Sequence, residues 1–464
     1  MERELRMKEN RQTLLALAEK TVAYGMKHSD QIEVLIRNNF EISAEIILGE
    51  INRTSKSQEA GASIRCVVDQ RLGSAFTNRL EQSILEKSVK RAIAAAKAST
   101  SDSTWQDFPQ PKKYPKEPKV WDNKIPETDP GVFVDMSTTM IQQTKQRDPE
   151  IIFGEGGAGG FFGWTAYANS NDIAISDRGT GVYAYAAFVT PIESGMTPMV
   201  WTIDVNRNFQ LDLDYVVENT LKDVHLAKNS AKGKTETGTV IFNASALDKL
   251  LTYAFMPAIK GDNVVREKSM LADKMGDMVA SKILSFTDDG LKENGYATEL
   301  FDGEGVARQK TPLIEKGKLR SFLWNNYWAQ RHGGITTGNA TRNLRTGVLN
   351  IAPTNIVVPG GKRSQEDMIS DIKSGYLING LQGAHSSNQE TGDYSVVGNP
   401  AFRIKDGKLV GAVHGLMLAG NAFEFIKKAE EVGSDVRAYL SDGGGSIIGP
   451  SIQFRNIQVV AKAE

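Results

Sequence analysis

Cysteine is nearly absent from this chain, which has a single one among 464 residues. A lone Cys66 excludes a disulfide framework and a cysteine-rich zinc site within one chain, and its scarcity fits a reducing compartment. It lies in the segment ASIRCVVD, whose alternation of apolar and polar residues predicts a strand. We therefore expect Cys66 to be a small buried side chain rather than a nucleophile.

Long apolar runs and net charge are lacking as well. No stretch approaches the roughly 18 apolar residues that cross a bilayer, and the N-terminal MERELRMKENRQTLLALAEK is charged where a signal peptide would be apolar. The formal net charge is −1, so the chain has no general attraction to phosphate backbones or anionic lipids. We expect a cytoplasmic protein with neither a nucleic-acid nor a membrane partner.

The familiar signatures of catalysis are missing too. No two of the five histidines lie within five residues of each other, so neither a helix nor a hairpin presents a local pair of metal ligands. His332, His385 and His414 could still meet in space, and the sequence leaves open a hydrolytic or metal site built from them. His414 is expected in a strand. No serine stands in the strand-to-helix setting of a nucleophile elbow.

Two further motifs have ordinary interpretations. The segment FGEGGAGGFFGW contains Gly154-x-Gly156-x-x-Gly159, the spacing of a dinucleotide fingerprint, but alternating strand patterns follow it instead of a helix. We interpret it as a flexible glycine loop. The adjacent carboxylates Asp288 and Asp289 run into Gly290 and predict a solvated turn.

Periodicity predicts an α+β fold in three parts. Residues 10–27 have helical spacing, four alternating strands follow within 31–78, and a second helix covers 81–99, so 1–100 form an N-terminal helix, four-strand, helix domain. Residues 101–130 are a linker or surface strap, because the segment 99–130 holds six of the fifteen prolines. A middle α+β domain at 131–232 has helices near 131–146 and 211–229. A large strand-rich C-terminal domain fills 233–464.

The C-terminal domain opens with a strand and then a helix. Ser245 and Asp248 are spaced like a capping box ahead of the apolar run LLTYAFM, which ends at Pro257 and Gly261. Nothing in this helix binds a metal or moves a proton well.

Segments spread over most of the chain resemble one family. They are AEIILGEINRTSKSQEAGASIRCVVDQRLGSAFTNRL, YANSNDIAISD, GDMVASKILSFTDDG, LIEKGKL, TGDYSVVGNPAFRIKDGKLVGAVHGLMLAGN and EEVGSDVRAY. Each is loose alone, but their order and spacing resemble the TldD/PmbA proteins, once named modulators of DNA gyrase and regarded as metallopeptidases. In that family, TldD-type chains carry His-Glu-x-x-x-His on a helix. The two histidines and a cysteine near the C-terminus bind zinc, and the glutamate serves as general base.

The resemblance implies that this chain lacks those groups. Counting back from Gly261 and Asp262 without a gap, the motif falls on Thr252, Tyr253 and Pro257, and the cysteine position falls in LSDGGGSIIG, which has none. The chain is therefore similar to the PmbA/TldE-type branch, with no catalytic residue, metal or cofactor of its own. Zinc is expected in a TldD-type partner.

The resemblance also implies the partners. A TldE-type chain pairs with a TldD-type zinc peptidase subunit as a heterodimer, or with itself as a homodimer, and the complex acts on unfolded peptides that enter in extended form. Tyr253, His385, Asp393 and Tyr394 are the candidates for the peptide site or the subunit interface, with plain packing roles as the alternative. The competing functions are a stand-alone hydrolase with a relocated site and a non-catalytic peptide-binding homodimer. Charge and motifs give no support to a role at DNA gyrase.

Overall fold

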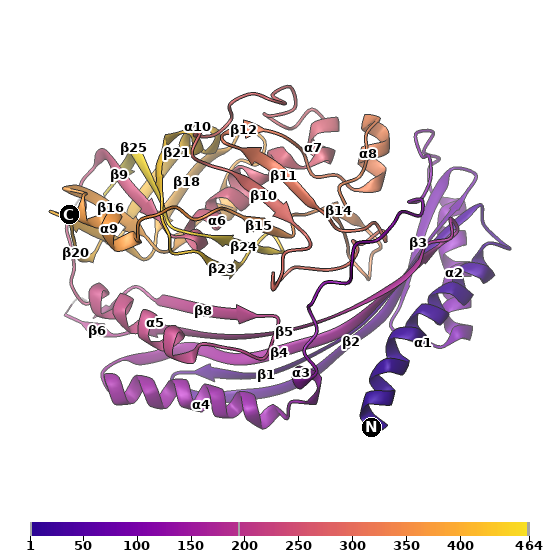
Figure 1. Cartoon of the computed structure of the whole chain (residues 1–464), viewed down its shortest axis with the longest axis horizontal. Helices are drawn as coiled ribbons and strands as arrows, with labels where there is room; N and C mark the ends of the chain where they lie inside the picture. The colour runs from indigo at the N-terminus through magenta and orange to yellow at the C-terminus, as the bar shows by residue number, and fades with distance from the viewer. Residues whose placement is uncertain (1, 194, 462–464) are drawn as a thin grey trace.

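The computed structural model describes residues 2–193 and 195–461, with side chains from residue 11 onward. It has two parts. A long curved sheet forms the lower part in Figure 1, with helices on its outer side, and a strand-rich C-terminal region lies over its inner side. The fold is α+β, as predicted from the sequence pattern.

The curved sheet has the strand order β3-β2-β1-β4-β5-β8, and neighbouring strands are antiparallel. β1 pairs with β2 on one side and with β4 on the other over most of its length, so it lies in the middle of the sheet. The strands are β1 (Gln31–Ile47), β2 (Glu50–Val68), β3 (Arg71–Thr77), β4 (Ile152–Asn169), β5 (Ala174–Val189) and β8 (Val200–Asn206).

The prediction of four strands in 31–78 is wrong, because the structure has three. The polar residues 54–60 do not form a turn: they continue β2, and each pairs with a residue of β1. Their mostly exposed side chains tolerate this polarity, and β1 supplies backbone hydrogen bonds along one edge of the strand. Since β1 also pairs with β4, the predicted units 1–100 and 131–232 contribute to one continuous sheet.

The predicted helices of both units are confirmed. α1, α2 and α4 pack against the outer side of the curved sheet, while α5 lies beside β8 and also contacts β20 of the C-terminal region. Asp129 caps α4 through the Gly131 amide, and Pro130 occupies the first turn, where its missing N–H costs nothing. The helices are α1 (Glu2–Gly25), α2 (Gln82–Ala98), α4 (Pro130–Arg147) and α5 (Leu213–Ala227).

The proline-rich segment has little regular structure, as predicted. Its one described helix is the single turn α3 (Lys124–Glu127). The segment nevertheless packs against the rest of the fold, because the side chains of Phe108, Val120 and Ile125 are buried. It runs as a strap from the sheet toward the C-terminal region (Figure 1).

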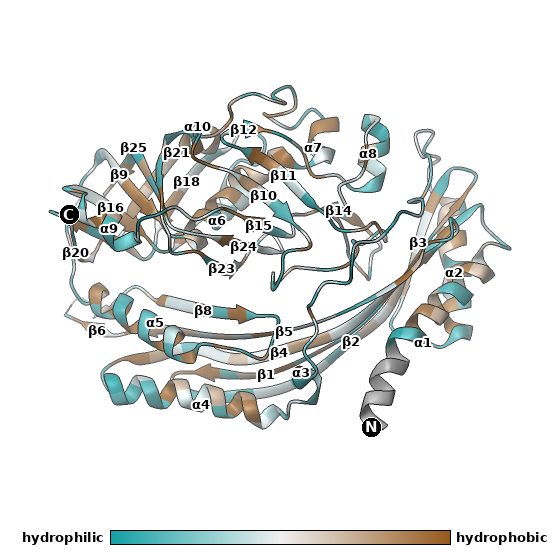
Figure 2. Cartoon of the chain, in the orientation of Figure 1, coloured by the Kyte–Doolittle hydropathy of each residue, from teal (hydrophilic) through white to brown (hydrophobic). Residues whose placement is uncertain are grey.

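The C-terminal region contains two larger sheets with α6 between them. Figure 2 shows apolar residues gathered in strands such as β9 and β25, while α9 on the outside is mostly hydrophilic. One sheet has the order β17-β18-β21-β25-β9-β16-β19-β20, with β22 added beside β25, and the other has the order β12-β11-β10-β15-β24-β23. A single apolar cluster joins α6 to both sheets.

The bounds of these elements follow. The first sheet comprises β17 (Leu381–Gln382), β18 (Asp393–Gly398), β21 (Leu416–Asn421), β25 (Ile452–Val460), β9 (Glu236–Phe242), β16 (Ser374–Ile378), β19 (Ala401–Lys405), β20 (Lys408–Ala412) and β22 (Ala429–Val432). The second comprises β12 (Lys318–Leu319), β11 (Lys310–Glu315), β10 (Phe286–Asp289), β15 (Asn355–Val357), β24 (Ser446–Gly449) and β23 (Arg437–Leu440). Short pairs are β13 (Ala340–Arg342) with β14 (Leu349–Ile351), and β6 (Pro191–Ile192) with β7 (Gly195–Met196). The helices and 3-10 turns are α6 (Ala244–Ala254), η1 (Met256–Ile259), α7 (Gly261–Val265), α8 (Asn326–His332), α9 (Gln365–Ser370), η2 (Ala384–Ser386), α10 (Ala422–Phe425) and η3 (Ile426–Lys428).

Four local predictions need correction. Asn243 caps α6 by accepting a hydrogen bond from the Ala246 amide, whereas Ser245 and Asp248 lie inside the helix and are buried. Asp288 is buried in β10, where it accepts hydrogen bonds from Asn339 and Thr354, so it is no solvated turn residue.

The other corrections concern a histidine and the glycine segment. His414 lies in the turn between β20 and β21 and is exposed, not in a strand. The glycine-rich segment is no loop but part of β4, inside the curved sheet.

Cys66 is buried as expected, and burial raises the pKa of its thiol to about 12. Within the described residues, the helices are all too short or too polar to pass through a lipid bilayer.

Candidate functional site

A cleft separates the inner face of the curved sheet from the C-terminal region. Its volume is about 1060 Å³. Side chains of β1, β4 and β5 form its floor, and residues 296–299, 340–342, 352–354 and 443–445 contribute to the opposite wall. The cleft combines a sheet surface with a polar wall and is large enough for several residues of an extended chain.

Glycines in the floor explain why this space is open. Gly163 of β4 and Gly179 of β5 line the cleft, and Gly159 lies four residues before Gly163 on the same face of β4. A Cβ at Gly163 would lie 2.2 Å from Asn39 Oδ1, and one at Gly179 would lie 2.5 Å from Arg207 Nη2. The glycine-rich segment therefore lets neighbouring side chains lie flat across the sheet, and a strand follows it where a dinucleotide fingerprint would have a helix.

Five arginines and four acidic residues line the cleft, so arginine is the most frequent charged residue there. Arg308 Nη2 donates to Glu299 Oε2 at 2.6 Å, and Arg207 Nη1 donates to the carbonyl oxygen of Tyr296 at 2.8 Å. Burial lowers the pKa of the Arg37 and Arg207 guanidiniums, against the opposing charge of Glu299. Although burial alone would raise the pKa of Glu299, Arg308 and Arg37 hold it below the usual range.

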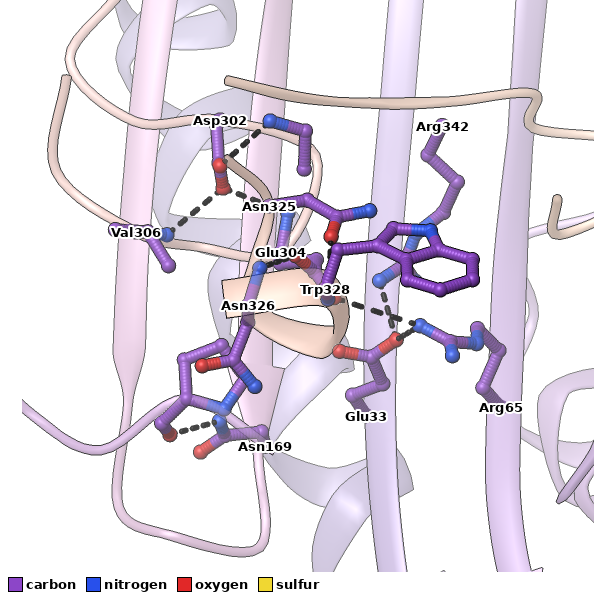
Figure 3. Close-up of polar contacts among 12 residues, drawn as sticks. Glu33, Arg65, Asn169, Asp302, Glu304, Val306, Asn325, Asn326, Trp328 and Arg342 are labelled. Carbon is purple, nitrogen blue, oxygen red and sulfur yellow. Dashed lines mark hydrogen bonds and ion pairs between the residues drawn. The ribbon is translucent and has the colours of Figure 1, made fainter. Parts of the chain in front are cut away.

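At one end the cleft is closed by a buried polar network (Figure 3). Glu33 of β1 accepts hydrogen bonds from Arg65 of β2 at 2.6 Å, from Tyr167 of β4 at 2.6 Å, and from Arg342 of β13. Less than a tenth of each of these side chains is exposed. The network joins three strands of the curved sheet to the C-terminal region.

Two further carboxyls, those of Asp302 and Glu304, lie beside this network. Glu304 Oε2 accepts a hydrogen bond from the Asn326 amide at 2.8 Å, and Asp302 accepts from the backbone amides of Glu304, Val306 and Ala340. Burial and the neighbouring Asp302 raise the pKa of Glu304, so this carboxyl tends to be protonated at neutral pH.

The opposite margin of the cleft lies beside α6, where the three motif positions fall. Thr252 and Tyr253 lie on α6, and Pro257 is buried in η1. Thr252 Oγ1 is 3.1 Å from Ser441 Oγ, and a Cβ at Gly443 would lie 2.8 Å from Thr252 Cγ2. The structure therefore brings the helix motif position and the C-terminal glycine loop into contact.

Asp248 belongs to this margin but was missed in the sequence. It precedes Thr252 by one helical turn, so both side chains lie on the same face of α6. Burial raises the pKa of Asp248 to about 7, and hydrogen bonds with Ser441 and Thr252 oppose the shift. The four-residue spacing was the available signal, but it was interpreted as part of a cap.

The four candidates for a peptide site or interface separate into two pairs. The Tyr253 ring lies edge-on to the exposed His385 ring, 6.5 Å between centroids, so the fold brings these two together. Asp393 and Tyr394 point to opposite sides of β18: Asp393 is exposed, and hydrogen bonds from Asn421 and Thr391 lower its pKa, whereas Tyr394 is buried against Phe425. None of the four is among the described residues that line the cleft.

The cleft arginines were not identified from the sequence. Glu33, Arg37 and Glu41 alternate along β1 and therefore share a face, which was the signal for a charged surface. Their partners come from distant segments, so sequence spacing gave no sign of a cluster.

The three histidines of the alternative site do not gather. His332 stacks on Trp324 at 4.7 Å between ring centroids, His385 meets Tyr253, and His414 is exposed in its turn. In the part of the chain that the structure describes, no three His, Cys, Asp or Glu side chains are arranged to hold a metal. At the motif positions, a threonine, a tyrosine and a proline offer no imidazole, so these residues do not fit the zinc site of a TldD-type chain.

Comparison with known proteins agrees with this architecture. Residues 32–97 match the model of the PmbA/TldA metallopeptidase domain 1, and residues 235–461 match that of the PmbA/TldA metallopeptidase C-terminal domain. The crystal structure of TldE from Thermococcus kodakarensis is 32% identical, covers 96% of this chain and all of that one, and superposes with a TM-score of 0.92.

Curated relatives extend over the same length. An uncharacterised protein of Methanocaldococcus jannaschii is 29% identical over 94% of this chain and 98% of that protein. Metalloprotease PmbA of Escherichia coli is 23% identical over 92% of each chain. Matches to both domain models, together with near-complete coverage of a TldE structure, show that this chain belongs to the PmbA/TldD family of metallopeptidases.

Proposed function

We propose that this chain is the metal-free, TldE-like subunit of a cytoplasmic zinc peptidase complex that processes unfolded peptides. The observation that carries the proposal is the contact between Thr252 and Ser441. Thr252 occupies a helix position of the zinc motif, and Ser441 lies in the C-terminal loop from which a TldD-type chain supplies its cysteine. In this chain both contacting groups are hydroxyls. Hydrolysis then belongs to a TldD-type partner, and this chain holds substrate.

The cleft supports the substrate-holding role. It lies over the inner face of a sheet and leads to the glycine loop 443–445 beside Thr252. Aromatic rings of Phe161 and Tyr296, 5.5 Å apart, offer apolar contact within the cleft. An unfolded peptide in extended form fits such a surface, whereas a folded protein does not. Tyr253 and His385, outside the cleft, are the proposed contacts to the partner.

Zinc content and partner dependence test the proposal together. The untagged chain and a TldD-type chain with His-Glu-x-x-x-His from the same genome are purified separately and as a mixture, and zinc is measured by elemental mass spectrometry after dialysis. We expect zinc well below one per chain in this protein, about one in the partner, a stable complex, and hydrolysis of a labelled unfolded casein fragment by the complex. The matched control is a complex whose partner carries glutamine in place of the motif glutamate, which should form normally and not cleave.

The alternatives predict different results. A stand-alone hydrolase would retain near-stoichiometric zinc and cleave without the partner, and H332A, H385A and H414A would then locate its site. A peptide-binding homodimer would bind the casein fragment, form no complex with the partner and cleave nothing. Either result would overturn the proposed function.

A further inference from the structure

Arg37 is the most unusual charged residue of the cleft. It lies on β1 between Gly61 of β2 and Thr165 of β4, neither of which is charged. Among the described residues, no hydrogen bond or ion pair engages its guanidinium, although burial is strong enough to lower its pKa. Because Arg37 is only half-buried and lines the cleft, water can hydrate its unpaired N–H groups until a ligand supplies acceptors.

Arg207 and Arg308 reinforce this positive charge. They are 4% and 6% exposed, and the Nε–H of each has no acceptor in the described structure. Both, with Arg37, face the single carboxylate of Glu299. Glu299 is the carboxylate common to all three guanidiniums, although Asp302 and Asp288 also act on Arg308 and Asp177 also acts on Arg207. Nearby Glu33 already serves Arg65 and Arg342.

The other acids of the cleft do not balance the excess. Asp177 uses both oxygens to accept from the backbone amides of Leu300 and Arg178. Glu41 accepts from the Tyr183 hydroxyl, and the exposed Glu59 pairs with Arg345. The cleft therefore has more guanidinium donors than carboxylate acceptors within reach of Arg37.

Glu299 itself indicates what the cluster binds. Its side chain is 45% exposed and is bound to Arg308 through one oxygen. A carboxylate on a partly exposed side chain can leave its arginine when a better-placed carboxylate arrives, because planar guanidiniums bind carboxylates in paired hydrogen bonds. Beside it, the ring of Phe161 lies under the Arg207 guanidinium at 5.5 Å and offers a surface for an adjoining apolar side chain.

We propose that Arg37, Arg207 and Arg308 form a subsite for a carboxylate group of the bound peptide, and that Glu299 occupies it when no peptide is present. The carboxylate comes from the peptide C-terminus or from an acidic side chain. The inference rests on the proposed function, because it specifies which feature of the peptide the cleft recognises. It assigns the cleft a preference for anionic peptides that net charge alone would not suggest.

Three labelled peptides test this subsite on the full-length chain. Each is a nonapeptide of alanine, serine and valine with an N-terminal fluorophore: one has a free C-terminal acid, one a C-terminal amide, and one an amide with a central glutamate. Binding is measured by fluorescence anisotropy at low ionic strength. We expect the acid to bind at least tenfold more tightly than the plain amide. The glutamate peptide reports whether a side-chain carboxylate serves equally well.

Single-residue variants test whether a preference for the acid peptide depends on the cleft arginines. R37Q should abolish the difference between acid and amide, and E299Q, which removes the competing carboxylate, should increase affinity for the acid severalfold. R53Q is the matched control, because Arg53 is 69% exposed on neighbouring β2 and pairs with Glu45 outside the cleft. It should bind as the wild type does. Thermal unfolding of each variant verifies that it is folded.

The outcomes separate the two proposals. If all peptides bind equally well, or if R37Q keeps the preference for the acid, the carboxylate subsite is wrong while the peptide-binding cleft stands. If no peptide binds to the wild-type chain, both the subsite and the substrate-holding role are wrong.

Discussion

Two positions on one strand, four residues apart, have opposite electrostatic environments. Glu33 and Arg37 both project from the same face of β1 toward the C-terminal region. Around Glu33, two arginines and a tyrosine satisfy the carboxylate and water is excluded. Around Arg37, the face opens into the cleft and the guanidinium has no partner among the described residues. Between them Leu35 packs with Tyr167, Leu300 and Phe301 in a small apolar cluster.

This difference shows that one interface can both hold two parts of the fold together and present a binding surface. A buried charge is tolerated only when its hydrogen-bonding groups are satisfied, so the closed end must be complete in the protein itself. A cleft exposed to water can keep unsatisfied donors, because solvent hydrates them until a ligand arrives. Closed networks of this kind hold parts of the fold together, while incomplete ones mark binding surfaces.

Breaking the closed end should have the largest effect. Glu33→Gln keeps the volume of the side chain but leaves Arg342 buried without its carboxylate partner and Arg65 with only Glu304, 4.0 Å away. Breaking a buried pair in this way typically costs about 3–5 kcal/mol. The free energy of unfolding in urea measures the loss. Glu45→Gln on the same strand is the control: its pair with Arg53 is 3.5 Å long and exposed, so its loss should cost less than about 1 kcal/mol. A similar small loss for E33Q would show that the network does not hold the two parts together.

A pH titration sharpens the comparison at the far margin of the cleft. Asp248 has no arginine partner, and burial raises its pKa to about 7 from an ordinary value of about 3.9. Because the folded-state pKa is the higher one, its contribution to stability is complete below about pH 4 and is lost as pH rises to about 7. The loss is on the order of 4 kcal/mol, at about 1.4 kcal/mol per pKa unit.

Asp248→Asn removes this titration. Compared with wild type, the variant should gain unfolding free energy steadily between pH 4.5 and pH 7.5. Urea unfolding at several pH values measures the difference, and Asp273→Asn at an exposed position should follow the wild-type profile. A constant difference between D248N and wild type would mean that Asp248 is ionised throughout this range.

Filling the open floor tests whether the glycines create the cleft. A Cβ at Gly159 would lie 2.6 Å from the Tyr183 hydroxyl and 2.9 Å from the Ile42 carbonyl oxygen, so Gly159→Ala should cost about 1–3 kcal/mol and weaken peptide binding. Gly154→Ala on the same strand is the control, because its Cβ would meet nothing closer than 3.4 Å. Unfolding in urea and peptide anisotropy report both effects. Unchanged values for G159A would remove the steric explanation of the glycine segment.

The smallest expected change in stability belongs to Arg37. Because its guanidinium makes no hydrogen bond in the described structure, Arg37→Gln should shift the unfolding free energy by no more than about 0.5 kcal/mol. Arg342→Gln, at the closed end, should cost several times more. Urea unfolding of the two variants side by side gives this contrast directly. Equal losses would show that Arg37 is a structural residue and would remove the distinction between the two ends.

Local features of the fold were predictable, and features that depend on distant partners were not. Helical spacing predicts the helices that pack against the curved sheet, because an amphipathic helix is specified by residues only three or four positions apart. Asp288 was taken for a turn residue because its partners Asn339 and Thr354 are more than fifty residues away. The same reason explains the glycine segment, which is a strand only because β1 and β5 pair with it.

The sequence by itself determined the family and the α+β class, and it predicts that Thr252 and Pro257 stand at the histidine positions of the family motif, because these follow from residue identity, order and periodicity along the chain. Tertiary structure alone decided that the two N-terminal units share one sheet, that Thr252 meets Ser441, and that arginines from β1, the segment after β8 and a C-terminal loop face one carboxylate. The physical reason is the distance along the chain over which each interaction acts. Backbone preferences act over a few residues, whereas the pairing of strands and buried charges depends on groups that only the folded chain brings together.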